Sequence, residues 1–259
     1  MTINRDELRR EARATQEEHD GALRGMRDLV SRVLDPSSKA SDITKQDVLL
    51  SGLNRRRFLQ IGGVGVLSAA VLAACGKSDN KSSSSATTVA SGAKATMTDI
   101  AILRTASSLE HVAIDVYQKA IDNAGALGIS ATVADVAKLF QAQHKDHAGL
   151  FEGATKTAGG TPFMTANPAV MQSLAGRIAA LKTETDVLML ARDLENVAAA
   201  TYQSTVGAFD NLAYNAAAMS VGGVEARHAA VLNGVLKSDQ FPTKAFHTTQ
   251  GAVAVGTGL

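Results

Sequence analysis

The sequence has few of the residues that build β-sheets or interrupt helices. Tryptophan is absent from its 259 residues, and aromatic residues make up 4% of the chain. It contains four prolines, and none of them lies between Pro36 and Pro162. Alanine is abundant, and chains of this composition favour α-helices packed through small side chains over β-sandwiches. We therefore expect an all-α protein.

The sequence also lacks an excess of charge, a pair of cysteines and the short motifs of several enzyme classes. Its formal net charge is +1, so nothing in the composition calls for a nucleic-acid partner, and we expect none. Cys75 is the only cysteine, which excludes an internal disulfide bond. No Gly-x-Ser-x-Gly element or phosphate-binding loop occurs, so nothing indicates nucleophilic catalysis or nucleotide binding.

One segment, residues 55–75, has the order of features found in an export signal. It begins with the pair Arg55 and Arg56 and continues with an apolar run at residues 61–74. This run is shorter and less apolar than a membrane span, which needs about 20 apolar residues. With the arginine pair it resembles a twin-arginine translocation signal. The run ends in LAAC, which resembles a bacterial lipobox with Cys75 as the lipidated residue.

These resemblances imply an exported protein that is anchored to a membrane through lipid on Cys75. The implied partners are the twin-arginine export machinery and the membrane. The implied place is the outer face of the cytoplasmic membrane, or the periplasm and cell envelope. The alternative is that Cys75 is a small buried residue. If residues 55–75 are an export signal, residues 1–54 are a long signal leader, or a cytosolic segment that is retained if the signal is not cut. The Ser-rich residues 76–97 are expected to be a flexible tether.

A folded helical domain is predicted for residues 98–236, where apolar residues recur with helical spacing. Each of five predicted helices follows a polar residue that can cap its first turn: Thr98 or Asp99, Ser130, Asn167, Thr183 or Thr185, and Asn211. The third helix is short and begins at Pro168. The pair Gly222 and Gly223 is a weak point at which the last helix could kink. Residues 237–259 form a C-terminal tail without predicted structure.

The four long helices contain an internal repeat. Residues 109–118 have the sequence LEHVAIDVYQ, and residues 194–203 have LENVAAATYQ. In the partner helices, HKDHAGL at residues 144–150 matches EARHAAV at residues 225–231, with nearly the same offset. A helical hairpin therefore occurs twice. Two related αα-hairpins, with the short helix between them, predict an antiparallel four-helix bundle.

The repeated segments carry ionisable residues that can share one site. Glu225 and His228 are three positions apart, as are His144 and His147, so each pair lies on one helix face. Glu110 and Glu195 stand at matching positions among apolar residues. A buried carboxylate costs several kcal/mol unless it is compensated, and a metal ion compensates several at once. Taken separately, the Glu-His and His-His pairs could be solvated surface residues.

This arrangement resembles the ferritin-like di-iron carboxylate superfamily over roughly residues 98–236. The resemblance implies an antiparallel ferritin-like bundle in which Glu110 and Glu195 are terminal carboxylates and Glu225 is a bridging carboxylate. It implies that His147 and His228 are imidazole ligands. It also implies iron as the cofactor, as one or two ions, with manganese or zinc as alternatives.

The sequence departs from the family pattern at His144, which stands where a second bridging glutamate would be. The set then holds three carboxylates and three imidazoles, and three negative charges neutralise two divalent ions less well than four. An asymmetric dinuclear site, a single ion and a site that is harder to fill all remain open. The departure weakens an assignment to ferroxidase chemistry more than it weakens metal binding.

Three functions follow as hypotheses. The first is a membrane-anchored, exported metal-binding protein that handles iron or oxidants at the cell envelope. The second is a non-enzymatic envelope or stress-tolerance protein that keeps the bundle as a scaffold without metal. The third is an adaptor whose apolar grooves hold a partner. The sequence does not decide whether the protein is an enzyme, because one fold hosts many functions.

Overall fold

The computed structural model describes residues 5–34, 95–237 and 249–259, and it contains six α-helices and no strand in those ranges. The helices are α1 (Arg5–Leu34), α5 (Met97–Asp122), α6 (Ala131–Thr157), α7 (Pro168–Ala179), α8 (Glu184–Ser204) and α9 (Leu212–Val235). This confirms the predicted all-α class. Arg55, Arg56, Cys75 and all but the end of the 76–97 segment lie outside the described residues. Within them, every helix is too short or too polar to cross a bilayer.

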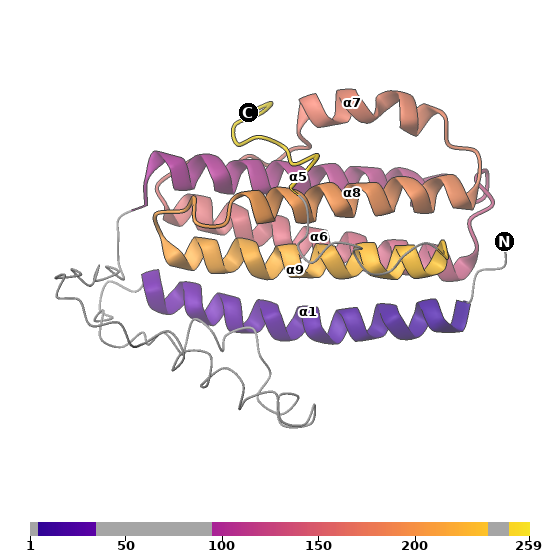
Figure 1. Ribbon diagram of the computed structural model, residues 1–259, viewed down its shortest axis with the longest axis horizontal. Coiled ribbons are helices and arrows are strands. Elements are labelled where there is room, and N and C mark those ends of the chain that lie inside the picture. Colours follow the sequence, from indigo (N-terminus) through magenta and orange to yellow (C-terminus); the bar gives the residue numbers. More distant parts are fainter. Residues whose placement is uncertain (1–4, 35–94, 238–248) are drawn as a thin grey trace, which may run out of the picture.

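The long helices form the two predicted hairpins. Helices α5 and α6 pack against each other along their lengths, as do α8 and α9, and the two pairs lie side by side (Figure 1). The connecting helix α7 packs on α5, where Leu174 joins a small core with Val112, Val116 and Leu190. Each hairpin buries one side against the other, so residues on the inner faces meet in the bundle interior.

The helix starts follow from their caps, with one correction. Helix α5 begins after Thr96, whose side chain forms a capping box with Asp99, so neither Thr98 nor Asp99 is the cap. Asp99 is fully buried, and its Oδ1 accepts a 2.9 Å hydrogen bond from the backbone nitrogen of Asp210. The capping box therefore also fastens α5 to the α8–α9 loop. The remaining caps are as predicted, with Thr183 rather than Thr185 before α8: Ser130, Asn167, Thr183 and Asn211.

Helix α9 is continuous through Gly222 and Gly223, the weak point at which the sequence allows a kink. A Cβ atom placed on Gly222 would lie 2.8 Å from Cβ of Tyr202, which is closer than real carbon atoms approach. A Cβ on Gly223 would meet only the side chain of Arg227 at 3.8 Å. Gly222 thus allows α8 and α9 to approach closely, because any side chain at this position would collide with Cβ of Tyr202.

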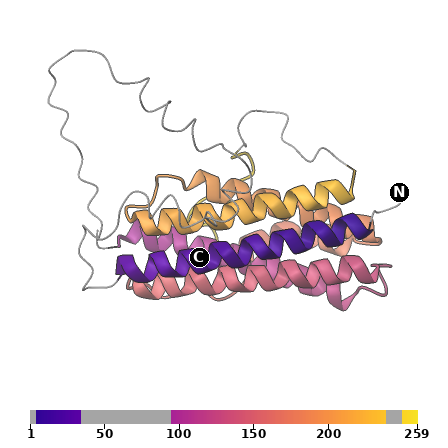
Figure 2. The same ribbon diagram turned by 90° about the horizontal axis from the view of Figure 1, so that it is seen from below.

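Part of the expected leader packs on the bundle. Helix α1 lies along α6 and α9, on the side of the molecule away from α5 and α8 (Figures 1 and 2). Leu8 and Ala12 join the hydrophobic core, and Thr15 and His19 are buried as well. These residues recur at helical spacing, so one stripe of α1 faces the bundle. The described residues therefore form five packed long helices rather than four.

The C-terminal residues 249–259 pack on the opposite side, over α5 and α8 (Figure 1). The backbone nitrogen of Val253 donates to Oγ1 of Thr201 at 3.0 Å, and that of Gly256 donates to Oγ1 of Thr105 at 2.9 Å. Asn167, the cap of α7, donates to the carbonyl oxygen of Thr257. The end of the predicted tail is therefore hydrogen-bonded to both hairpins.

Candidate metal centre

The six predicted ligands meet inside the bundle. Each is at most 2% exposed, and the four long helices of the two hairpins supply all of them: Glu110 from α5, His144 and His147 from α6, Glu195 from α8, and Glu225 and His228 from α9. They divide into two groups of four in which one possible ligand atom of each residue lies within 4.8 Å of the others. His144 and Glu225 belong to both groups. The arrangement can therefore hold one ion, or two neighbouring ions that share these residues.

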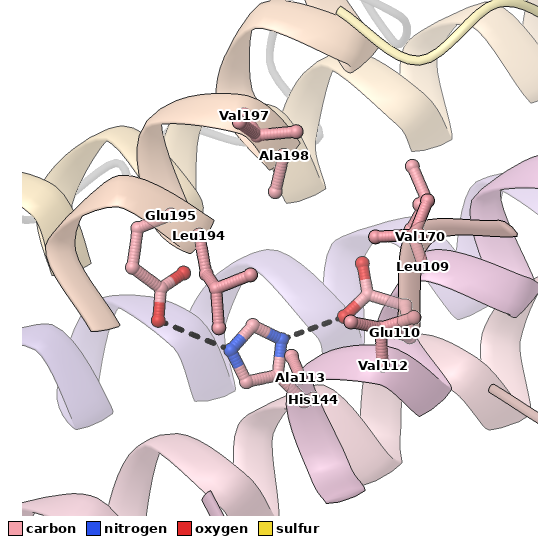
Figure 3. A pocket seen from close by; sticks show the side chains of 10 residues that line it. All are labelled: Leu109, Glu110, Val112, Ala113, His144, Val170, Leu194, Glu195, Val197 and Ala198. Atoms are coloured by element: carbon pink, nitrogen blue, oxygen red, sulfur yellow. Dashed lines mark hydrogen bonds and ion pairs between the residues drawn. The ribbon is translucent and has the colours of Figure 1, made fainter. Parts of the chain in front are cut away.

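His144 lies between the single carboxylates of the two hairpins (Figure 3). Its Nδ1 is 2.7 Å from Oε2 of Glu110, and its Nε2 is 3.2 Å from Oε1 of Glu195. Nδ1 is also 3.7 Å from Oε1 of Glu225. Because both ring nitrogens face carboxylates, His144 spans the centre at the place where the family pattern has a carboxylate.

Glu225 lies between the other two imidazoles. Its Oε1 is 2.8 Å from Nδ1 of His147, and its Oε2 is 2.9 Å from Nδ1 of His228. These distances are those of ion pairs, yet neither carboxylate oxygen accepts a well-aligned hydrogen bond from any residue that the structure describes. A fully buried carboxylate without aligned donors is what a coordinated metal ion would satisfy. Carboxylate and imidazole donors together suit iron, manganese and zinc, so the residues fit a transition-metal ion.

Two tyrosines hold the single carboxylates, and each does so across the repeat. The hydroxyl of Tyr117 on α5 donates to Oε1 of Glu195 on α8 at 2.5 Å. The hydroxyl of Tyr202 on α8 donates to Oε1 of Glu110 on α5. Burial, followed by the neighbouring carboxylates, raises the pKa of both hydroxyls well above the ordinary value. Both tyrosines therefore stay protonated donors, which fix the carboxylates and cross-link the hairpins.

The imidazoles keep the single carboxylates ionised. Burial alone would raise the pKa of Glu110, but the hydrogen bond with His144 and the charges of His144 and His147 outweigh it and lower the pKa to about 2. Burial acts in the same direction on Glu195. There the charges and hydrogen bonds of His144 and His228 hold the pKa well below its ordinary value. Both groups are thus anionic at neutral pH without a metal ion.

The carboxylates in turn keep protons on the imidazoles. Burial lowers a histidine pKa, but here the charge of Glu225 leads the opposing effects that raise the pKa of His147 to about 9. The same carboxylate and Glu195 raise the pKa of His144 well above its ordinary value, and Glu195 leads the effects that raise the pKa of His228. Without metal the cluster neutralises itself, and a binding ion must displace these protons.

Gln143 supports the far side of His228 and was not anticipated from the sequence. Nε2 of His228 is 2.5 Å from Oε1 of Gln143, while its Nδ1 faces Glu195 and Glu225. The ring of Phe140 stacks on the same imidazole with 3.9 Å between centroids. Gln143 therefore fixes Nε2 of His228 and Phe140 fixes the plane of its ring, so that Nδ1 points toward the carboxylates of the centre.

A narrow apolar cleft reaches the centre between α5 and α8 (Figure 3). It offers about 30 Å³ to water-sized groups, and its lining includes Glu110, His144 and Glu195 together with Leu109, Val170 and Leu194. Room for one water needs roughly 10–15 Å³ on this measure, so the cleft admits only molecules of a few atoms.

His111, the remaining histidine beside Glu110, is not part of the centre. It pairs with Glu152 at 2.9 Å and stays partly exposed.

Comparison with known proteins agrees with the fold. The family model of the ferritin-like domain matches residues 98–238, which is more than half of the chain. The protein therefore belongs to the ferritin-like domain family. No match was found among curated proteins or among solved structures.

Proposed function

We propose that this protein is an exported, membrane-anchored member of the ferritin-like family that binds one or two iron ions and uses them to handle iron or small oxidants. The observation that carries the proposal is the buried set of three carboxylates and three imidazoles around Glu225, whose oxygens lack aligned donors among the described residues. Manganese and zinc fit the same donors, so the choice of iron rests on the family.

The chain would hold a first ion with Glu110, His147 and Glu225, and a second with Glu195, His228 and Glu225. His144 can donate to either position because its two nitrogens face opposite carboxylates. A bound iron pair would supply two electrons, enough to convert one hydrogen peroxide and two protons into two waters. The two protons would come from solvent, because the imidazoles must give up protons to bind the ions.

The cleft limits what can reach such a centre. Its lining between α5 and α8 is mostly apolar, and the free space is about 30 Å³. Dioxygen and hydrogen peroxide are small and neutral, so they meet these limits, whereas an organic substrate does not. This favours reaction with small oxidants over oxidation of a larger metabolite.

Metal analysis of the full chain, purified without a histidine tag, tests the proposal. We expect one or two iron ions per chain after anaerobic loading with Fe(II), and loss of bound iron in Glu225→Ala. Glu152→Ala is the matched control, because Glu152 pairs with His111 outside the centre. Absence of iron, manganese and zinc under all loading conditions would refute metal binding.

A metal-free scaffold is the second candidate function. The self-neutralised cluster supports it, because three carboxylates and three imidazoles balance one another without an ion. The two functions differ in a simple measurement. A scaffold keeps the same melting temperature with and without Fe(II), whereas a metal protein gains stability from ligand binding.

The proposed location rests on the sequence alone, through Arg55, Arg56 and Cys75. We expect wild-type protein in the membrane fraction of the expressing cell and Cys75→Ala in the soluble fraction. Replacing both arginines by lysine should block export and leave the protein in the cytoplasm. Equal fractionation of wild type and Cys75→Ala would remove the support for a lipid anchor.

A further inference from the structure

A chain of hydrogen bonds links the candidate centre to α1. Nε2 of His228 contacts Oε1 of Gln143 at 2.5 Å, and Nε2 of Gln143 donates to Oε1 of Gln16 at 2.8 Å. Nε2 of Gln16 then donates to Oδ1 of Asp20 at 2.6 Å. Asp20 is 47% exposed, whereas Gln143 and His228 are almost completely buried. The chain thus runs from the surface of α1 to a predicted ligand.

The direction of this chain is fixed at its outer end. A carboxylate only accepts hydrogen bonds, so Asp20 requires the NH₂ group of Gln16 to face it. The carbonyl oxygen of Gln16 then faces Gln143, which must present its own NH₂ group. Gln143 is left with its carbonyl oxygen toward His228, and this oxygen needs a proton on Nε2 of the imidazole.

We propose that α1 sets the tautomer of His228: the chain Asp20–Gln16–Gln143 keeps a proton on Nε2 and leaves Nδ1 to bind the ion. Asp20, Gln16 and Gln143 are positioning residues in this scheme, and α1 is a wall of the centre. The inference rests on the proposed metal binding, since a fixed Nδ1 lone pair matters only for a ligand. Partners of this kind orient metal-bound histidines and change metal affinity about 10–100-fold.

The remainder of α1 supports the same role. His19 is fully buried, and its ring lies 5.1 Å from that of His147, the equivalent imidazole of the other hairpin. Helix α1 therefore backs both outer imidazoles, one through a ring contact and one through hydrogen bonds. Because α1 lies on the N-terminal side of Cys75, the inference concerns the uncut chain, which would bind its metal before any processing at that cysteine removes α1.

Two substitutions of Gln16 test the direction of this series of hydrogen bonds. Gln16→Glu presents only acceptors, so Gln143 keeps its orientation. Gln16→Lys presents only donors, so Gln143 must turn its carbonyl outward and its NH₂ group toward Nε2 of His228. Gln16 is half-buried, and glutamate and lysine have similar helix propensities, so both variants should fold.

We expect Gln16→Glu to bind Fe(II) and Zn(II) as the wild type does, and Gln16→Lys to bind each about 10-fold or more weakly. In ¹⁵N-histidine spectra, the Nε2 proton of His228 should be retained in wild type and Gln16→Glu and lost in Gln16→Lys. The same pair of charges at exposed Ala14 is the control, and Ala14→Glu and Ala14→Lys should bind metal alike.

Equal metal affinity and an unchanged Nε2 proton in both Gln16 variants would overturn the inference. So would an affinity difference that the Ala14 pair reproduces, because net charge would then explain it. If the wild type binds no metal at all, the proposed function fails. The Nε2 proton, read in the metal-free protein, then decides alone whether residue 16 directs the hydrogen bonds.

Discussion

The two hairpins bring nearly the same side chains to the centre and differ at one position. Three pairs match: Glu110 with Glu195, His147 with His228, and Tyr117 with Tyr202. The exception is His144 of the α5–α6 hairpin, where the α8–α9 hairpin has Glu225. The matched tyrosines and carboxylates cross-link the hairpins, so they maintain the frame. The unmatched position decides the charge, because it replaces one of four carboxylates by an imidazole.

Making the hairpins alike at this position should have the largest effect. In His144→Glu, four carboxylates would face two imidazoles, and the metal-free protein should lose about 3–5 kcal/mol of unfolding free energy, as expected for an uncompensated buried charge. Metal should reverse the loss, because four carboxylates neutralise two divalent ions. We expect two Fe(II) ions per chain, measured by anaerobic titration, and a large rise in melting temperature on loading.

His144→Gln separates charge from shape in this experiment. It removes the imidazole without adding a carboxylate, so it should not increase the number of bound ions. If His144→Glu binds no more metal than His144→Gln, the imidazole does not limit the charge of the centre, and the comparison of the hairpins has no chemical consequence.

The stability of the metal-free protein should depend on pH through two groups of the α5–α6 hairpin, Glu110 and His147. Glu110 has its pKa lowered from 4.5 to about 2, so its contribution to stability is complete above pH 4.5 and is lost as the pH falls through about 2. His147 has its pKa raised from 6.5 to about 9, so its contribution is complete below pH 6.5 and is lost as the pH rises through about 9. Melting temperatures with a chelator should therefore be highest between pH 4.5 and 6.5.

Bound metal should reverse the loss of stability that the metal-free protein shows above pH 6.5. Ligands must lose their protons to bind, so loading should become tighter between pH 6.5 and 9, where the metal-free protein weakens. A metal-free melting temperature that rises over this range would show that the imidazoles do not carry the protons assigned to them.

The sequence was sufficient to place the six candidate ligands, and the reason is local. Residues three apart share a helix face, and the repeat indicates which helices are equivalent, so the predicted four-helix bundle brings Glu110, Glu195 and Glu225 together with the imidazoles. The caps were predictable for the same reason. The expected cap at Thr98 or Asp99 was wrong, because α5 begins after Thr96 and Asp99 is the partner of Thr96 in the capping box.

The missed features depend on how the helices meet. Tyr117 is on the same face as Glu110 but donates to Glu195, because the two hairpins pack face to face. Gln143 contacts Gln16 of α1 and His228 of α9, and the sequence of α6 alone does not reveal either contact. A signal for α1 did exist, since Leu8, Ala12, Thr15, His19 and Leu23 form one buried stripe, but a charged segment before an export signal is expected to be a leader.

The tyrosine cross-links provide a symmetric test of the frame. Tyr117→Phe and Tyr202→Phe each remove a hydrogen bond to a buried carboxylate, so each should cost about 1.5–3 kcal/mol by denaturant unfolding, with similar values for the two. Tyr214→Phe is the control, because the buried Tyr214 hydroxyl has no hydrogen-bond partner among the described residues. Its loss should be close to neutral. Unequal costs for Tyr117 and Tyr202 would show that the hairpins are not equivalent at this level.

The smallest effect is expected from the glycine pair of α9, which has no counterpart in α6. Gly222→Ala would place a carbon 2.8 Å from Cβ of Tyr202, an atom fixed to the α8 backbone, so the helices must separate at a cost of about 1–2 kcal/mol. Gly223→Ala meets only Arg227 and should raise stability by up to about 1 kcal/mol through helix propensity. Because Tyr202 holds Glu110, Gly222→Ala should also weaken metal binding, whereas Gly223→Ala should not. Equal unfolding free energies for the two variants would mean that the approach of α8 to α9 does not depend on Gly222.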